Sequence, residues 1–182
     1  MDGISDQDIL KVFSQKGKEE KAFALILDKY QERIYWHVRK IVLQHEDAND
    51  VLQNTFIKIW KGLPSFRGDS ELYTWIYRIA TNEALSFLKQ KANKNGKNVE
   101  DPDLALTNML KADEYFDGDD LQLKLQLAMS HLPEKQRLVF QMKYYEDMKY
   151  ERISEILNTS VGALKASYHH AVRKIREEIG ED

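Results

Sequence analysis

Apolar residues recur at three- and four-residue spacing along most of the chain, which is the pattern of amphipathic α-helices. One or two long helices are predicted over 19–43, followed by a helix that begins at Asp47 as N-cap and ends near Leu63. The apolar stripe of that second stretch consists of Ala48, Val51, Leu52, Thr55, Phe56, Ile59, Trp60 and Leu63. Pro64 stops the pattern, and a further helix is predicted over 72–90.

The last third of the chain predicts shorter helices that are separated by turn residues. Their ranges are 121–132, 136–145, 150–157 and 161–179. The final two flank Asn158, Thr159 and Ser160, and the last helix is the longer and more basic of the pair. Two helices around a short turn, with a basic second helix, are typical of helix-turn-helix DNA-binding motifs. No useful stretch alternates apolar and polar residues as a strand does, so the predicted fold class is all-α.

Charge divides the chain into parts that the overall net charge of -3 conceals. The net charge is +3 over 1–97, −7 over 98–120 and +1 over 121–182. The acidic part is also rich in turn-forming residues and poor in apolar ones, as linkers are. We therefore predict two small helical domains, 1–92 and 121–182, joined by a flexible or partly helical acidic linker, 93–120.

Composition excludes several classes of protein. The chain of 182 residues has no cysteine, which excludes disulfides and thiolate metal sites. No apolar run approaches the ~20 residues of a membrane-spanning helix, and the first residues lack the apolar centre of a signal peptide. We expect no direct membrane insertion and a cytoplasmic location.

Basic and small side chains gather on the predicted last helix. Ser160 is placed to cap it, and its cations Lys165, Arg173, Lys174 and Arg176 all precede its first acid. Its outward positions include Ala163, Lys165, Ala166, Ser167, His169 and His170, whose sizes suit the major groove of DNA. The residues alone leave a second interpretation open, because a cationic helix end also complements the helix dipole.

The helix predicted to follow Asp47 has a polar face opposite its apolar stripe. At 100° per residue this face consists of Asp50, Gln53, Asn54, Ile57 and Lys61. An isoleucine surrounded by polar residues suits a protein interface with an apolar centre and a charged rim. A solvated face with one exposed isoleucine is the alternative, which the residues alone favour.

The next predicted helix crowds aromatic residues beside polar and basic ones. Tyr73, Trp75 and Tyr77 lie next to Arg78 and Asn82, with lysines beyond. Stacking aromatics beside cations are typical of surfaces that hold single-stranded nucleic acid. In the alternative, Trp75 and Ile79 pack in the core and the two tyrosines cover it; Trp75 is expected in the core in either case.

The sequence contains little that indicates an enzyme. The one cluster of histidine and carboxylates, His45, Glu46, Asp47 and Asp50, matches no metal-binding spacing. His169 and His170 are adjacent, so they point to different sides of a helix. No glycine-rich phosphate loop or nucleophile elbow is present. We expect no catalysis, cofactor, metal or small-molecule substrate.

Two long stretches together resemble a known family. The run "DANDVLQNTFIKIWKGLPSFRGDSELYTWIYRIATNEALSFL" resembles the second conserved region of bacterial sigma factors of the extracytoplasmic-function (ECF) subfamily. The run "LPEKQRLVFQMKYYEDMKYERISEILNTSVGALKASYHHAVRKIREEI" resembles their fourth region. Both regions occur in the family's order and spacing and cover most of the chain outside the linker.

This resemblance implies a factor that binds core RNA polymerase and directs it to promoters. Family members dock the polar face of the second-region helix on the β′ coiled coil, which implies Asp50, Gln53, Asn54, Ile57 and Lys61 here. Many members carry an acid where this chain has Asn54. The implied polymerase partners are the β′ coiled coil and the β flap, and an anti-sigma factor is a further expected partner.

The resemblance also implies two promoter contacts. For the minus-ten element it implies a flipped-base pocket and the helix behind it, at Gly62, Leu63, Ser65, Phe66, Arg78 and Asn82, with melting driven by binding of unpaired bases. For the minus-thirty-five element it implies Tyr150, Lys165, Ala166, Ser167, His169, His170 and Arg173. Ser167 and His170 replace frequent arginines, which predicts an unusual upstream element and a pH-sensitive grip. The alternative is a stand-alone helix-turn-helix regulator.

Overall fold

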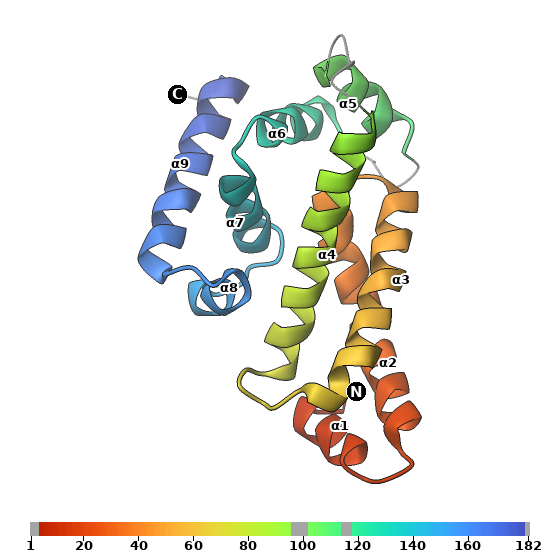
Figure 1. The fold of residues 1–182 in the computed structure, drawn as a ribbon. Helices are drawn as coiled ribbons and strands as arrows, with labels where there is room; N and C mark the ends of the chain where they lie inside the picture. The colour runs from red at the N-terminus through yellow and green to blue at the C-terminus, as the bar shows by residue number, and fades with distance from the viewer. Residues whose placement is uncertain (1–3, 96–101, 114–117, 181–182) are drawn as a thin grey trace. The chain divides into compact units, whose positions relative to one another are not determined.

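The computed structural model describes residues 4–95, 102–113 and 118–180, and all the regular elements among them are helices. The all-α prediction is therefore confirmed. The chain divides into two compact units, Met1–Lys91 and Ala92–Asp182 (Figure 1). Each unit is described by itself.

The first unit is a bundle of long helices with one short helix at its start. Its elements are α1 (Asp6–Phe13), α2 (Glu19–Val42), α3 (His45–Gly62), a 3-10 turn η1 (Leu63–Ser65) and α4 (Leu72–Asn95), which continues beyond the unit's end. The stretch 19–43 thus forms one helix. Leu43 follows it in a left-handed conformation, with φ of 68°, and this turns the chain into α3.

The start of α3 differs from the sequence prediction. Its N-cap is Gln44, whose side chain makes no capping bond, so the prediction of Asp47 as N-cap was wrong. Asp47 lies in the first turn, where its carboxylate accepts a hydrogen bond from Lys91 Nζ at 2.6 Å. Lys91 thereby ties α4 to the first turn of α3.

Helix α1 was not predicted, because eight residues give too short a periodic pattern. Ser5 caps it by accepting a hydrogen bond from the Asp8 backbone N–H, and Ile9 is fully buried. Asp6 ties it to α2 by accepting hydrogen bonds from the Tyr30 hydroxyl and from Lys29 Nζ, both at 2.7 Å to Oδ1. These contacts extend the core of the unit to its first helix.

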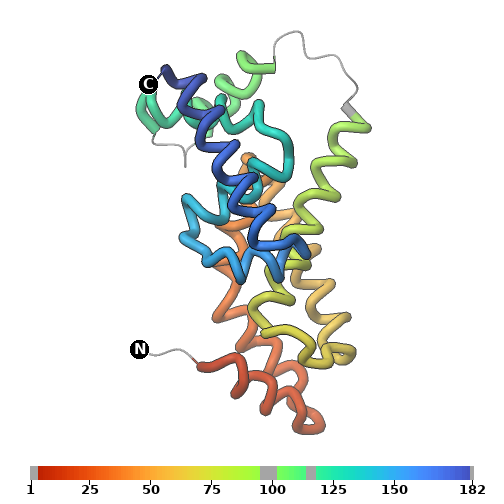
Figure 2. Tube along the Cα trace, turned by 90° about the vertical axis from the view of Figure 1, so that its left-hand side faces the viewer, coloured from red at the N-terminus to blue at the C-terminus, as the bar shows by residue number. Residues whose placement is uncertain are grey.

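The described part of the second unit contains five helices after the end of α4. They are α5 (Pro102–Lys111), α6 (Asp120–Ser130), α7 (Glu134–Tyr144), α8 (Tyr150–Leu157) and α9 (Val161–Ile179), the last drawn in deep blue in Figure 2. The bounds of α8 and α9 match the predicted ranges. Helix α5 lies in the segment predicted as linker and packs on α6. The flexibility of that segment and the domain boundaries stay predictions.

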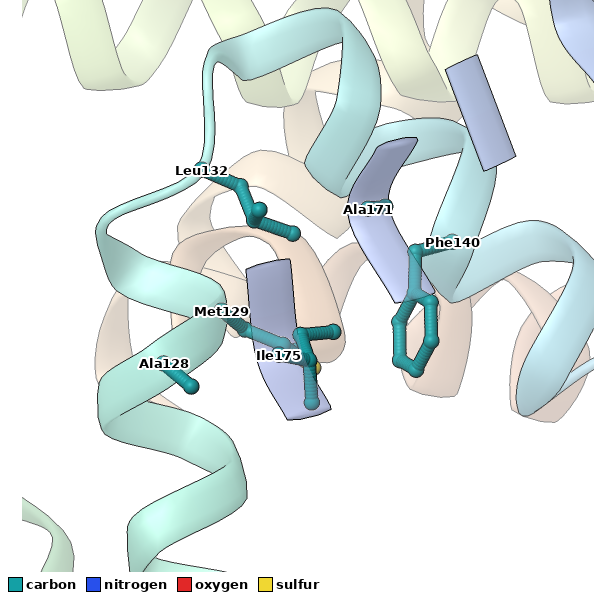
Figure 3. Packing of buried hydrophobic residues seen from close by; sticks show 6 residues of the cluster. All are labelled: Ala128, Met129, Leu132, Phe140, Ala171 and Ile175. Atoms are coloured by element: carbon teal, nitrogen blue, oxygen red, sulfur yellow. The ribbon is translucent and has the colours of Figure 1, made fainter. Parts of the chain in front are cut away.

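One hydrophobic cluster joins α6, α7 and α9. It consists of Ala128, Met129, Leu132, Phe140, Ala171 and Ile175, all buried (Figure 3). The close-up shows the α6 residues and Phe140 facing the side chains of α9. Helix α9 is thus held by this core through Ala171 and Ile175, and it also packs on α8.

The turn between α8 and α9 has the geometry of a helix-turn-helix. Asn158 ends α8 in the left-handed region, with φ of 49°, a conformation that asparagine tolerates better than most residues. Ser160 begins α9 by accepting a hydrogen bond from the Ala163 backbone N–H, as predicted. The two caps fix the direction in which α9 leaves the turn.

Candidate functional surfaces

The polar face predicted on α3 is exposed along its whole length. Asp50, Gln53, Asn54, Ile57 and Lys61 all face solvent. The Ile57 side chain is 44% exposed although it is apolar. No residue of α1, α2 or α4 covers this strip, so a partner protein can reach all five positions.

A groove of about 740 Å³ runs beside this face, between α2 and α3. Its apolar lining comes from Phe23, Leu27, Leu52, Phe56 and Trp60. Trp60 is 40% exposed and packs edge-on against Phe23, with ring centroids 5.1 Å apart. Trp60 thus belongs to the apolar stripe, as predicted, and remains partly exposed at the groove.

The groove adds contacts that the sequence alone did not suggest. Glu20 and Asp50 supply carboxylates among its lining residues, while Ile57 joins it to the polar face. An exposed apolar groove with charged edges is typical of protein interaction sites. The signal that could have indicated the groove is the pair Phe23 and Leu27, two apolar residues about one turn apart on α2 that are only half-buried.

The loop after α3 wraps around one tryptophan. Phe66 packs against the Trp75 ring at a centroid distance of 5.1 Å, and both side chains are half-buried. A Cβ added at Gly62 would lie 3.0 Å from Trp75 Cζ2, so a glycine lets the helix end approach the indole. Ser65 is exposed and donates a hydrogen bond from its hydroxyl to the Gly62 carbonyl at 2.8 Å.

Leu63 differs from the other residues of this loop. Its side chain is only 1% exposed and belongs to the core of the first unit. Arg78 is half-buried and Asn82 is exposed, one turn apart on α4. Of the residues implied for the minus-ten element, four have side chains that reach the surface at least partly, Gly62 is half-buried, and Leu63 is buried.

The aromatic residues of α4 differ in burial from what was predicted. Trp75 is half-buried, so its expected place in the core was wrong. Tyr77 is 4% exposed and stacks on Tyr73 at 4.2 Å between ring centroids. It also lies 4.9 Å from the ring of the buried His37. Trp75 and Tyr77 are two residues apart and so point to nearly opposite sides of α4. Tyr77 is the one that packs against α2, at His37.

A buried polar pair joins α2 to α4 beneath this surface. His37 Nε2 lies 2.9 Å from Thr81 Oγ1, and the Thr81 hydroxyl donates its one proton to the Tyr77 carbonyl at 2.7 Å. Thr81 Oγ1 must then accept from His37, which places the imidazole proton on Nε2. This pair could not be predicted from the sequence, since His37 and Thr81 lie far apart along the chain.

The helix-turn-helix presents the residues implied for the minus-thirty-five element. Lys165, Ala166, His169, His170 and Arg173 are exposed, and Ser167 and Tyr150 are half-buried. The Lys165 Nζ lies 5.8 Å from the centroid of the Tyr150 ring, a cation–π contact between α9 and α8. Arg173 pairs with Glu177 on the same helix at 3.6 Å.

An aromatic stack supports this surface from below. Phe140 stacks on Tyr144 at 5.0 Å and on Tyr168 at 5.8 Å, and Tyr168 meets Tyr150 edge-on at 6.4 Å. Burial, followed by the charge of Tyr168, raises the pKa of Tyr150, so its hydroxyl stays protonated at neutral pH. Burial raises the pKa of the neighbouring Tyr145 to about 12. The stack gives the start of α8 a neutral, packed aromatic support.

The described residues contain neither a metal-binding cluster nor a helix that could span a membrane. None of the histidine and carboxylate groups there comes together in threes as a metal site requires. The rings of His169 and His170 lie 6.1 Å apart. Within the same residues, no helix is long and apolar enough to cross a bilayer.

The two units match two parts of one protein family. The family "Sigma-70 region 2" matches residues 26–94, and "Sigma-70, region 4" matches residues 122–175. The fold and its exposed surfaces thus define the chain as a sigma factor of the sigma-70 class. The first match lies almost entirely in the first unit and ends three residues beyond it, the second lies in the second unit, and residues 95–121 are unmatched.

Individual sigma factors that are similar to this chain indicate the subfamily within the sigma-70 class. The chain is 30% identical to the RNA polymerase sigma-H factor of Pseudomonas aeruginosa over 173 residues, which cover 91% of this chain and 89% of the relative. It is also 30% identical to the ECF RNA polymerase sigma-E factor of Escherichia coli over 185 aligned positions, covering 97% and 95%. The chain belongs to the ECF sigma factors, the initiation factors that direct RNA polymerase to promoters.

Solved structures share the fold. The sigma factor RpoE of Bartonella quintana, solved with the anti-sigma factor NepR, aligns with a TM-score of 0.66 at 22% identity, covering 89% of this chain and 99% of that one. CnrH, solved with the cytosolic domain of CnrY, aligns with a TM-score of 0.69 at 17% identity, covering 97% of both chains. At these identities the likeness concerns the fold alone.

Proposed function

We propose that this sigma factor docks on core RNA polymerase through α3, with Ile57 at the centre of the contact. The observation that carries this proposal is an apolar side chain left exposed among polar ones, beside an apolar groove. Energetic centres of interfaces are apolar or aromatic residues surrounded by a polar rim. Asp50, Gln53, Asn54 and Lys61 form that rim, and the β′ coiled coil is the partner.

The first unit then opens the minus-ten element. The loop of Gly62, Leu63, Ser65 and Phe66 captures a base that has left the stack, and Arg78 and Asn82 hold the separated strand. Extruding a base costs a few kcal/mol, which stacking and phosphate contacts with the open strand offset. The half-buried Phe66 and Trp75 rings support this assignment, because they wall the loop with aromatic surface. No nucleotide hydrolysis enters the scheme, and the proposal assigns no reaction to this chain.

The second unit reads the minus-thirty-five element as a duplex. Helix α9 enters the major groove with Ala166, Ser167, His169 and His170 toward the bases, while Lys165, Tyr150 and Arg173 contact the backbone. Small and polar side chains at these exposed positions support the assignment. The β flap is the polymerase partner of this unit.

An anti-sigma factor is the further partner in the proposal. Of the two structural neighbours, RpoE was solved with an anti-sigma factor and CnrH with the cytosolic domain of CnrY. These complexes support an anti-sigma partner for this chain. An anti-sigma factor acts by covering the surfaces that polymerase needs. Because the polymerase and the promoter are cytoplasmic in bacteria, we place this chain in the cytoplasm.

The test of the proposed function is the substitution Ile57→Asp in the full chain. We expect it to abolish co-purification with bacterial core RNA polymerase and promoter-dependent transcripts. Leu121→Asp serves as the matched control, since Leu121 is similarly exposed but lies on α6 in the other unit. If Ile57→Asp binds polymerase as wild type does, the interface lies elsewhere. If wild type binds duplex DNA and no polymerase, the stand-alone regulator is the better account.

A further inference from the structure

Two lysine ammonium groups, from two different helices, make cation–π contacts with the Tyr150 ring. Lys143 Nζ, from α7, and Lys165 Nζ, from α9, each lie 5.8 Å from its centroid. Phosphates of one DNA strand follow each other at about 3.4 Å along the helix axis. A strand that meets Lys165 therefore passes Lys143 within a few nucleotides.

The position of Lys143 is held from two sides. Its Nζ donates a hydrogen bond to Asp147 at 2.9 Å, and the ring beneath it is itself fixed edge-on against Tyr168. An ammonium group has three donors, so two remain for a phosphate. The carboxylate of Asp147 is the acidic group against Lys143, and it opposes the approach of DNA.

We propose that Lys143 is a further phosphate contact of the minus-thirty-five surface, held in place by the ring that it shares with Lys165. The inference rests on the proposed function, because it takes α9 to be the helix that enters DNA. Tyr150 is a positioning residue in this scheme. It orients two cations along one strand and reads no base.

Salt dependence of DNA binding tests this inference. The full chain is titrated with a short duplex of mixed sequence at several salt concentrations, since a phosphate contact needs no particular sequence. Lys143→Gln is expected to lower the slope of log affinity against log salt by about 0.9. Lys143→Arg keeps the slope, Asp147→Asn raises the affinity, and Lys124→Gln on α6 leaves both unchanged.

Each outcome has a separate meaning. An unchanged slope for Lys143→Gln, with a lower slope for Lys165→Gln, overturns the inference and keeps the DNA-binding face. Unchanged slopes for both variants overturn the proposed use of α9. A lower thermal midpoint without a lower slope makes Lys143 a structural residue only.

A second, independent observation concerns His131 at the end of α6. Its Nε2 lies 2.8 Å from Asp103 Oδ1 on α5, and its Nδ1 lies 3.0 Å from Glu178 Oε2 on α9. A neutral imidazole has one N–H, and ionised carboxylates only accept hydrogen bonds. Both contacts can therefore be hydrogen bonds only when His131 carries its second proton.

We infer that His131 is a proton-dependent latch that holds α5 on the second unit. The hydrogen bonds to Asp103 and then Glu178 raise the pKa of His131 above its usual value. A raised pKa means that the latch is complete at acidic pH and is lost as the pH rises through the folded-state pKa. When α5 is released, the connection between α4 and α6 becomes longer. The distance that this connection can span between the two units then changes.

Hydrogen exchange of the α5 amides in the full chain tests the latch. After correction for intrinsic rates, we expect protection to fall about two- to fivefold between acidic and alkaline pH, the size of an exposed ion pair. His131→Gln should remove this pH dependence, and His169→Gln should leave it intact. A flat profile in wild type, or the same profile in His131→Gln, overturns the inference.

Discussion

At the scale of single residues, one carboxylate links three helices of the first unit. Asp6 accepts hydrogen bonds from Lys29 and Tyr30 of α2, and its Oδ2 lies 3.3 Å from the Tyr73 backbone nitrogen at the start of α4. Burial, followed by the hydrogen bond to Asp6, raises the pKa of Tyr30, so the phenol stays a donor at every physiological pH. Asp6 thereby positions the beginning of the helix proposed to hold the open strand.

We predict that Asp6→Asn lowers the free energy of unfolding of the first unit by about 1–3 kcal/mol, because a half-buried charged acceptor with several donors is lost. Urea denaturation of the full chain measures the change. Asp8→Asn is the matched control, since Asp8 lies on the same helix but is exposed beside Lys11. Equal losses from the two substitutions would contradict the role given to Asp6.

At the scale of elements, the helix-turn-helix depends on two short caps. The Asn158 backbone N–H closes the end of α8 on the Ser154 carbonyl, and the Ser160 hydroxyl oxygen accepts from the first turn of α9. The direction of α9 follows from these residues and from its contacts with α6, α7 and α8. DNA recognition needs that direction, since side chains of α9 meet bases only when the helix lies in the groove.

We predict that Ser160→Ala destabilises the second unit by about 1 kcal/mol, the usual cost of losing an N-cap. For a domain of this size the thermal midpoint should fall by about 4–8 °C. Differential scanning calorimetry measures it, and Ser160→Asn is the control, because asparagine caps helices as well as serine does. An undiminished midpoint in Ser160→Ala would show that the cap contributes nothing.

At the scale of the whole molecule, each unit has a hydrophobic core of its own. Ile26, Ile34, Ile59 and Ile76 are fully buried in the first unit, and the cluster around Phe140 fills the second. Separate cores allow one unit to bind polymerase and the single strand while the other binds duplex DNA. This division suits a factor that must contact two promoter elements and two parts of polymerase.

We predict that residues 92–182 fold alone, because the buried cluster around Phe140 is made of residues from this unit. The fragment should melt cooperatively and bind duplex DNA with the salt slope of the full chain. Residues 1–95 should bind core polymerase without it. A fragment that shows no cooperative transition would mean that the second unit needs the first for its fold.

Much of the fold could be predicted because helical periodicity is a local signal. The ranges of α8 and α9, the Ser160 cap and the exposed face of α3 all follow from residues within a few turns of one another. Helix α1 was missed, and α5 was anticipated only as part of a flexible or partly helical linker, because short helices carry little periodicity and depend on contacts with other elements. The site residues of both promoter surfaces came from family resemblance and stay predictions.

By itself, then, the sequence determined the all-α class, the helix-turn-helix and the family, because period, caps and motifs are written in neighbouring residues. Tertiary structure decided the rest. It placed Tyr77 in the core and left Trp75 and Trp60 partly exposed, since a helical wheel gives a direction and only a packed neighbour gives burial. It also made the groove between α2 and α3, because a groove needs two helices and neither one contains it alone.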